Sequence, residues 1–203
     1  MAALTCNFGL SICTHRQSKM YLGGFLIARM TMEHPSVARA NELLAEVQTD
    51  GVRELVRNWL SIHPKDRLPG RQHFDPLGIP RLLKSIVLTD VERDPYRFRV
   101  RVLGTAVADA FGRDFTGKYM DEVFEKHRES LSHSMRVQVV ETGLPCLRPA
   151  VPGTFRGMDI APQEGIHLPL ATDGASVDNV LSMFVYVPGT TDDANGVWHL
   201  ANR

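Results

Sequence analysis

The chain has 203 residues, of which 43% are hydrophobic and 23% charged, a balance typical of one globular domain with extensions. Basic and acidic residues number 23 each, so there is no net field to attract nucleic acid or an anionic membrane. The three cysteines (Cys6, Cys13 and Cys146) form no CxxC pair, which argues against a disulfide framework or a zinc site and favours reduced thiols in a cytoplasmic protein.

Residues 1–33 are predicted to be a tail outside the fold. They contain an apolar stretch over 20–30 that follows Arg16 and Lys19. The stretch is too short to span a bilayer, and no A-x-A-like cleavage site follows it. A weak signal or anchor segment is the alternative that stays open. At the other end, residues 189–203 are predicted to be a C-terminal tail.

Two amphipathic helices are predicted after the N-terminal tail. Apolar residues recur at helical spacing over 37–47. The second helix follows Asp50, a favourable N-cap, and carries Trp59 on its apolar face until Pro64 ends it. The segment 64–80 is rich in proline and glycine and is predicted to be a loop.

A β-hairpin is predicted around the turn sequence Asp94-Pro95, with strands over 85–93 and 97–104. A four-residue loop sets a register in which one face is apolar and the other carries matched charges, which a one-residue slip would destroy. The predicted pairs are Glu92 with Arg97, Asp90 with Arg99 and Leu88 with Arg101 on one face, and Val91 with Phe98, Thr89 with Val100 and Val87 with Val102 on the other.

The rest of the chain predicts a helical middle followed by strands. A long helix is expected over about 121–142, with Gly143 as its stop. Three strands are expected over 146–155, 165–171 and 179–187. Strands on both sides of central helices indicate an α+β domain, an antiparallel sheet with helices on one face, preceded by the two amphipathic helices.

Five short motifs occur in a fixed order along the chain. They are Leu68-Pro69 with Phe74-Asp75-Pro76, Ile79-Pro80 with Leu82-Leu83, Arg101-Val102-Leu103-Gly104-Thr105, Phe111-Gly112-Arg113-Asp114-Phe115-Thr116-Gly117-Lys118, and Leu168-Pro169-Leu170. Over residues 34–188 this order resembles the PAS fold, and more narrowly a family of small bacterial proteins with a single PAS domain and a Trp-containing N-terminal helix. The resemblance implies a five-stranded sheet that cups a ligand pocket, with the N-terminal helices available for packing or dimerisation.

One motif invites a different interpretation, because Gly112-x-x-x-x-Gly117-Lys118 matches a P-loop up to its last residue. Tyr119 stands where a P-loop needs a hydroxyl for Mg²⁺, and a parallel βαβ context is missing. We therefore interpret the two glycines as turn residues and predict no nucleotide site.

His127 is the candidate cofactor ligand. It sits at the edge of the predicted inner stripe of the 121–142 helix, which includes Phe124, Leu131 and Met135. The resemblance makes a haem conceivable here, because haem-binding PAS domains take an axial histidine from the corresponding helix. We favour the other interpretation, a hydrogen-bonded histidine at the margin of the core.

Arg101 is the second candidate. In the predicted register it faces Leu88 and has no acidic partner, unlike Arg97 and Arg99. It either binds an anionic ligand or anchors the loop around Asp75, and the sequence leaves both open.

Taken together, these features predict a PAS-type sensory or regulatory module with no effector domain and no catalytic or metal site of its own. Its expected partners are a small ligand and a signalling protein, or a second copy bound through the N-terminal helices, with neither nucleic acid nor membrane. The identity of any cofactor stays open. The alternative is a small α+β enzyme or carrier that binds an apolar molecule in the cupped sheet.

Overall fold

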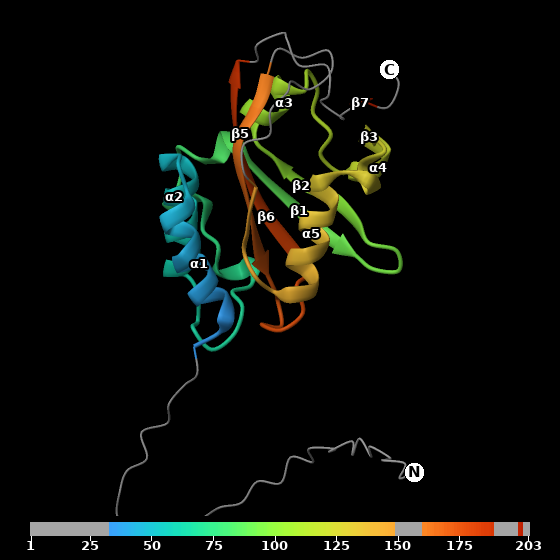
Figure 1. Cartoon of the computed structure of the whole chain (residues 1–203). Coiled ribbons are helices and arrows are strands. Elements are labelled where there is room, and N and C mark those ends of the chain that lie inside the picture. The colour runs from blue at the N-terminus through green and yellow to red at the C-terminus, as the bar shows by residue number, and fades with distance from the viewer. Residues whose placement is uncertain (1–32, 149–159, 189–198, 201–203) are drawn as a thin grey trace, which may run out of the picture. The chain divides into compact units, whose positions relative to one another are not determined.

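The computed structural model describes residues 33–148, 160–188 and 199–200 (Figure 1), all within the unit Thr31–Arg203. Most of the two predicted tails lies outside these residues, so the tail assignments stay predictions. Within the C-terminal one, β7 (His199–Leu200) pairs with β3 (Phe124–Glu125) in an antiparallel ladder.

Both N-terminal helices are confirmed, as α1 (Pro35–Glu46) and α2 (Asp50–Ser61). The Trp59 indole N–H donates a hydrogen bond to the Pro169 carbonyl at 3.0 Å, which fixes α2 on the sheet. The apolar faces that the helical spacing predicts are buried in the chain's own core. Their buried members are Val37, Ala40, Leu43, Val52, Leu55, Val56 and Trp59.

The proline-rich loop that follows is confirmed as a segment of short turns. Within and just after it lie the 3₁₀ turns η1 (Arg71–His73), η2 (Pro76–Gly78) and η3 (Leu83–Ser85). The Asp75 carboxylate caps η2 by accepting from the Leu77 backbone N–H at 2.9 Å.

A five-stranded antiparallel sheet forms the centre of the domain, in the order β2-β1-β6-β5-β4. This confirms the predicted α+β class. The predicted strand over 146–155 is described only up to Arg148, because residues 149–159 lie outside the described part of the chain. The strands are β1 (Ile86–Glu92), β2 (Arg97–Leu103), β4 (Cys146–Arg148), β5 (Ile160–Leu170) and β6 (Asn179–Pro188).

The predicted register of β1 and β2 is confirmed next to the turn and wrong beyond it. The pairs from Glu92–Arg97 to Thr89–Val100 form as expected. A bulge between Leu88 and Thr89 then shifts the ladder, so that Leu88 faces Val102. Because a bulge places two residues of one strand opposite one of the other, Arg101 is left without a cross-strand partner in the ladder.

The predicted helix over 121–142 is wrong in its first half. The chain instead forms α4 (Met120–Val123), then β3, η4 (His127–Glu129) and finally α5 (Leu131–Thr142). Lys126 interrupts the helix because its backbone is left-handed, with φ of 55°.

Helix α5 therefore has its own start and its own buried stripe. The Ser130 hydroxyl caps it by accepting from the His133 backbone N–H at 3.1 Å. Leu131, predicted on the inner stripe, begins the helix and is 49% exposed. Gly143 ends α5 as predicted, with φ of 66°. The buried residues of the helix are Ser132, Met135, Arg136, Val139 and Val140.

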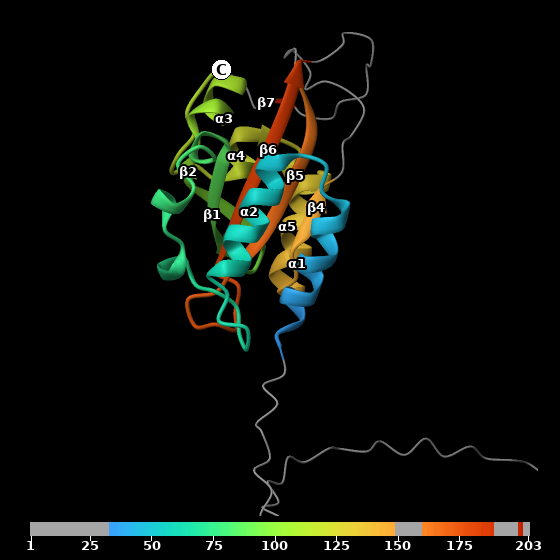
Figure 2. The same ribbon diagram turned by 90° about the vertical axis from the view of Figure 1, so that its left-hand side faces the viewer.

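Helices cover both faces of the sheet (Figures 1 and 2). The central helices α3 (Thr105–Ala110), α4 and α5 lie on one face, as predicted, and α1 and α2 cover the opposite face. Strand neighbours point to alternate faces, so His167 and Leu168 serve different layers. His167 lies on the α5 side, where it contacts Phe184 and is reached by the charge of Arg136, so Leu168 points to the opposite side.

A buried carboxylate joins the sheet to the link between α1 and α2. Glu164, on β5, accepts hydrogen bonds from the backbone N–H groups of Gln48 at 2.8 Å and Thr49 at 2.9 Å. The Thr49 hydroxyl donates a third. Charge-assisted hydrogen bonds of this kind are about twice as strong as neutral ones, so Glu164 holds α2 against the sheet.

Candidate ligand site

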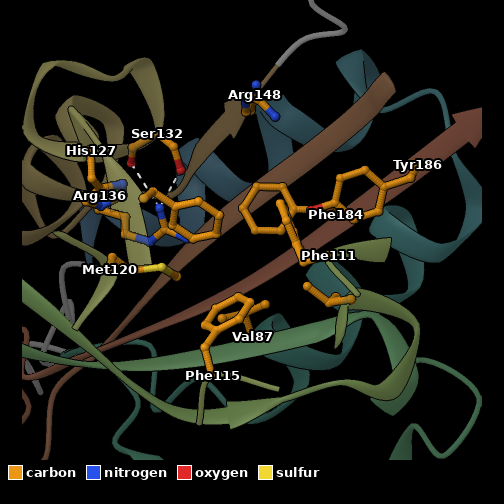
Figure 3. A pocket seen from close by; sticks show the side chains of 12 residues that line it. Val87, Phe111, Phe115, Met120, His127, Ser132, Arg136, Arg148, Phe184 and Tyr186 are labelled. Carbon is orange, nitrogen blue, oxygen red and sulfur yellow. Dashed lines mark hydrogen bonds between the residues drawn. The ribbon is translucent and has the colours of Figure 1, made fainter. Parts of the chain in front are cut away.

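A cavity of about 40 Å³ lies between the sheet and the helices α3, α4 and α5 (Figure 3). That volume corresponds to about three water molecules. Its polar lining consists of His127, Ser132, Arg136, Arg148 and Tyr186, and its apolar lining of Val87, Val107, Phe111, Phe115, Met120, Phe124 and Phe184.

Phenylalanine rings form the apolar walls. Phe111, Phe115 and Phe124 contact one another edge to face, with ring centroids 5.2–5.8 Å apart. Phe111 also meets the Tyr186 ring edge to face at 6.1 Å. Edge-to-face pairs add about 0.5–1.5 kcal/mol each to the burial of their area, so this part of the cavity is tightly packed.

Two buried arginines meet the cavity from different elements. Arg136 of α5 is 1% exposed and Arg148 of β4 is 4% exposed. Arg136 donates from Nη1 to the carbonyl oxygen of Ser132 at 3.2 Å and to its hydroxyl, as Figure 3 shows. In both arginines the Nε–H has no hydrogen-bond partner among the described residues.

Burial shifts the pKa values of the titratable groups in and beside the cavity. Burial lowers the pKa of Arg136 to about 10, and burial also lowers the pKa of Arg148. Burial raises the pKa of the Tyr186 hydroxyl, with the arginines opposing. His167 donates or accepts at Nδ1 with the Ser182 hydroxyl at 2.8 Å, and burial followed by both arginines drives its pKa well below the ordinary value. The site therefore combines positive charge with a neutral histidine and a neutral tyrosine.

This architecture, a five-stranded antiparallel sheet cupping a small cavity under short helices, is matched in sequence as well. Residues 47–185 match the family model of the PAS domain. The chain is a member of the PAS domain family. Membership gives it the general role of a sensory or ligand-binding module, as predicted. No curated protein matches the chain.

Two kinds of feature, a membrane-spanning helix and a cluster of metal ligands, are absent from the described part of this PAS domain. None of its helices has the length and apolar composition that crossing a membrane requires. Among the same residues, no group of three or more histidine, cysteine or acidic side chains is placed to hold a metal ion.

His127 lines the cavity of the PAS domain, although from η4 rather than from the predicted helix. Burial lowers its pKa to about 3, with Arg136 and His133 adding to the effect and Asp121 opposing it. The ring is therefore neutral at physiological pH. A haem does not fit a cavity of about 40 Å³, since drug-sized ligands alone need about 300 Å³ or more. His127 as a cofactor ligand stays a prediction.

Arg101 lies outside the cavity, on the bulged part of β2. The expectation that it lacks an acidic partner is wrong, because its Nε lies 3.2 Å from a carboxylate oxygen of Asp90. The bulge explains the error, since it releases Arg101 from Leu88 and lets it reach two positions further along β1. Its side chain is 53% exposed, and its role in ligand binding stays a prediction.

The other two arginines of the hairpin, Arg97 and Arg99, also have partners that differ from the predicted ones. Arg97 donates to the Asp121 and Glu122 carboxylates, and Arg99 donates to the Gly117 carbonyl at 3.0 Å. The predicted cross-strand charge ladder is thus replaced by contacts to the loop and to α4. Gly117 itself, like Gly112, has a positive φ, in agreement with our interpretation of these glycines as turn residues.

The sequence pattern did not predict the cavity residues Arg136, Arg148 and Tyr186. One signal was available: Arg136 follows Ser132 by four residues and precedes Val139 and Val140, so helical spacing alone puts it on the buried stripe. For Arg148 no comparable signal exists in its three-residue strand.

Proposed function

We propose that this PAS domain is a regulatory module that responds to a small molecule in the cavity and transmits the response to α1 and α2. It acts without catalytic activity of its own. The carrying observation is that β6 lies between the cavity and the N-terminal helices and contributes residues to both sides.

Neighbouring residues of β6 show this link. Phe184 lines the cavity, whereas Met183 packs against α2 so closely that a Cβ added to Gly51 would meet its Cε at 2.7 Å. A ligand that shifts Phe184 therefore moves the backbone that supports α2. In thermodynamic terms, the ligand selects the conformation that it binds best.

The partner-facing surface in this proposal is polar. The apolar sides of α1 and α2 are buried, and their outer sides carry ion pairs such as Arg39 with Glu42 at 3.0 Å and Arg53 with Asp50 at 2.8 Å. We therefore propose that a signalling partner, or a second copy of the chain, binds through charges. Sedimentation of the full chain at low and high salt tests this, and assembly that strengthens with salt would contradict it.

The experiment that tests the sensory role uses the freshly purified full chain. Native mass and absorption spectra should show a bound small molecule, and its removal should increase amide hydrogen exchange in α1 and α2. Unchanged exchange in these helices after removal would contradict the transmission.

The presence of Arg136, Arg148 and Tyr186 in the cavity lining also supports the alternative, a carrier or small enzyme that binds its molecule in the cupped sheet. A carrier would bind without changing the exchange of α1 and α2. An enzyme would convert the recovered compound on re-addition, which mass spectrometry of the small-molecule fraction would reveal.

A further inference from the structure

The positive charges of the two buried cavity arginines are only weakly compensated by the groups around them. Arg136 has the oxygen atoms of Ser132, and its guanidinium carbon lies 6.0 Å from the Phe98 ring centre and 5.8 Å from that of Phe184. Cation–π contacts recover only part of the free energy that burying a charge costs. Burial of the second arginine, Arg148, adds to this cost.

Neither arginine is paired with a carboxylate among the described residues. Asp121, whose charge reaches His127, is bound by Arg97 at 2.9 Å and Arg128 at 2.8 Å. Glu164, a buried acid of β5, binds the α1–α2 link on the opposite face of the sheet. The described part of the cavity therefore carries positive charge that an anionic ligand would neutralise.

The size of the cavity indicates which anion. A volume of about 40 Å³ favours a small head group, and a carboxylate, with three heavy atoms, is smaller than a phosphate, with five. Guanidinium groups bind the planar carboxylate through parallel N–H donors, and the Nε–H of each arginine has no hydrogen-bond partner among the described residues. The rings of Phe111, Phe115 and Phe124 next to this charge offer an apolar surface for the rest of the molecule.

We infer that the ligand of this cavity is an organic monocarboxylate with a small apolar body, whose head group binds Arg136 and Arg148. The inference rests on the proposed function, since it names the class of molecule to which the module responds. The phenylalanine side chains move apart to admit the apolar body, because the present volume accommodates the head group alone.

The test compares carboxylates with uncharged analogues of the same shape on the full chain. The probes are acetate, butanoate and benzoate, each paired with its amide, in a carboxylate-free buffer. At about one hundred times its Kd, a carboxylate raises Tm by roughly 5–10 °C, and its amide has a much smaller effect. Calorimetry then gives the Kd of the best probe.

Variants assign the effect to the arginines. Arg136→Met and Arg148→Met should each weaken carboxylate binding by at least about tenfold, since a hydrogen bond to a charged group contributes about 1.5–3 kcal/mol. Arg136→Lys keeps the charge without the planar fork, so its carboxylate affinity should lie between those of the unmodified protein and Arg136→Met. If Arg136→Met does not fold, the affinities of Arg136→Lys and Arg148→Met are the test. Arg57→Met removes the same charge from the exposed side of α2 and should leave binding unchanged.

The outcomes separate the two proposals. Equal stabilisation by amides, or by chloride and nitrate, overturns the carboxylate assignment, as do arginine variants that bind normally. If no carboxylate stabilises the protein but a neutral compound co-purifies with it, the ligand class is wrong and the sensory proposal stands. If no probe binds and the native mass equals the sequence mass, both proposals fall.

Discussion

The two faces of the sheet bury charge in opposite ways. On the α1–α2 face, the Glu164 carboxylate accepts three hydrogen bonds from the helix link. On the cavity face, Arg136 and Arg148 are equally buried, yet each keeps an Nε–H without a partner among the described residues. A satisfied buried charge stabilises one arrangement, and an unsatisfied one indicates a place for a ligand. The α1–α2 face thus stabilises the fold, and the cavity face is suited to bind a ligand.

The largest expected effect comes from the structural face. Trp59→Ala should lower the free energy of unfolding by about 3–5 kcal/mol, because it empties a fully buried site and removes the hydrogen bond to Pro169. Guanidinium unfolding measures it. Leu77→Ala, at an exposed position, is the control and should stay within about 0.5 kcal/mol. A small loss at Trp59 would mean that α2 is only loosely attached to the sheet.

Glu164→Gln should destabilise the same face by about 1.5–3 kcal/mol. The amide replaces an acceptor-only carboxylate and weakens the charge-assisted hydrogen bonds to Gln48 and Thr49. Urea unfolding gives the value, and Glu54→Gln on the exposed side of α2 is the matched control. Equal stability of the two variants would remove the contrast between the faces.

The histidines on both faces predict a loss of stability in acid. Burial lowers the pKa of His127 to about 3 and that of His63 to about 4, so below pH 6.5 the unfolded chain binds protons that the native chain does not. Stability is therefore fully present above pH 6.5 and falls as the pH drops toward these values.

His127→Gln should reduce the slope of unfolding free energy against pH by about 1.4 kcal/mol per pH unit below pH 6.5. With His63→Gln the reduction should end near pH 4, the folded-state pKa of His63, and with His127→Gln it should continue toward pH 3. Thermal unfolding at a series of pH values measures both slopes. An unchanged slope for His127→Gln would show that this ring takes up protons in the folded protein.

Arg136→Met should change stability in the opposite direction from Glu164→Gln. Without ligand, it replaces a buried charge by an apolar side chain and should raise the free energy of unfolding by about 1 kcal/mol. Arg57→Met, measured in the same denaturant series, serves as the surface control. A loss of stability beyond about 1 kcal/mol would mean that the cation–π contacts make Arg136 a structural residue.

The smallest effect belongs to Arg101. Arg101→Gln removes an ion pair whose side chains are 53% and 37% exposed, so the loss should lie within about 0–1 kcal/mol. Chemical denaturation of the variant and of Asp90→Asn measures it. If Arg101→Gln abolishes ligand binding while stability is retained, the sequence-based prediction of an anion contact at Arg101 holds after all.

The sequence by itself determined the features that depend on local pattern. The helical spacing over 37–47 predicted α1, the apolar face around Trp59 predicted α2, and the alternation beside Asp94-Pro95 predicted the near half of the hairpin. Each of these elements is specified by residues a few positions apart, and periodicity reports on that range. The order of the elements, together with the five motifs, was sufficient to predict the PAS fold.

Only the tertiary structure decided the interruption at Lys126, the bulge that turns Arg101 toward Asp90, and the cavity itself. Helical pattern continues through residues 121–142, and packing of Phe124 against Phe111 and Phe115 outweighs it. The cavity combines Arg136 of α5 with Arg148 of β4 and Tyr186 of β6. A buried charge is recognised by what surrounds it, and here the surroundings come from strands and helices that the sequence keeps apart.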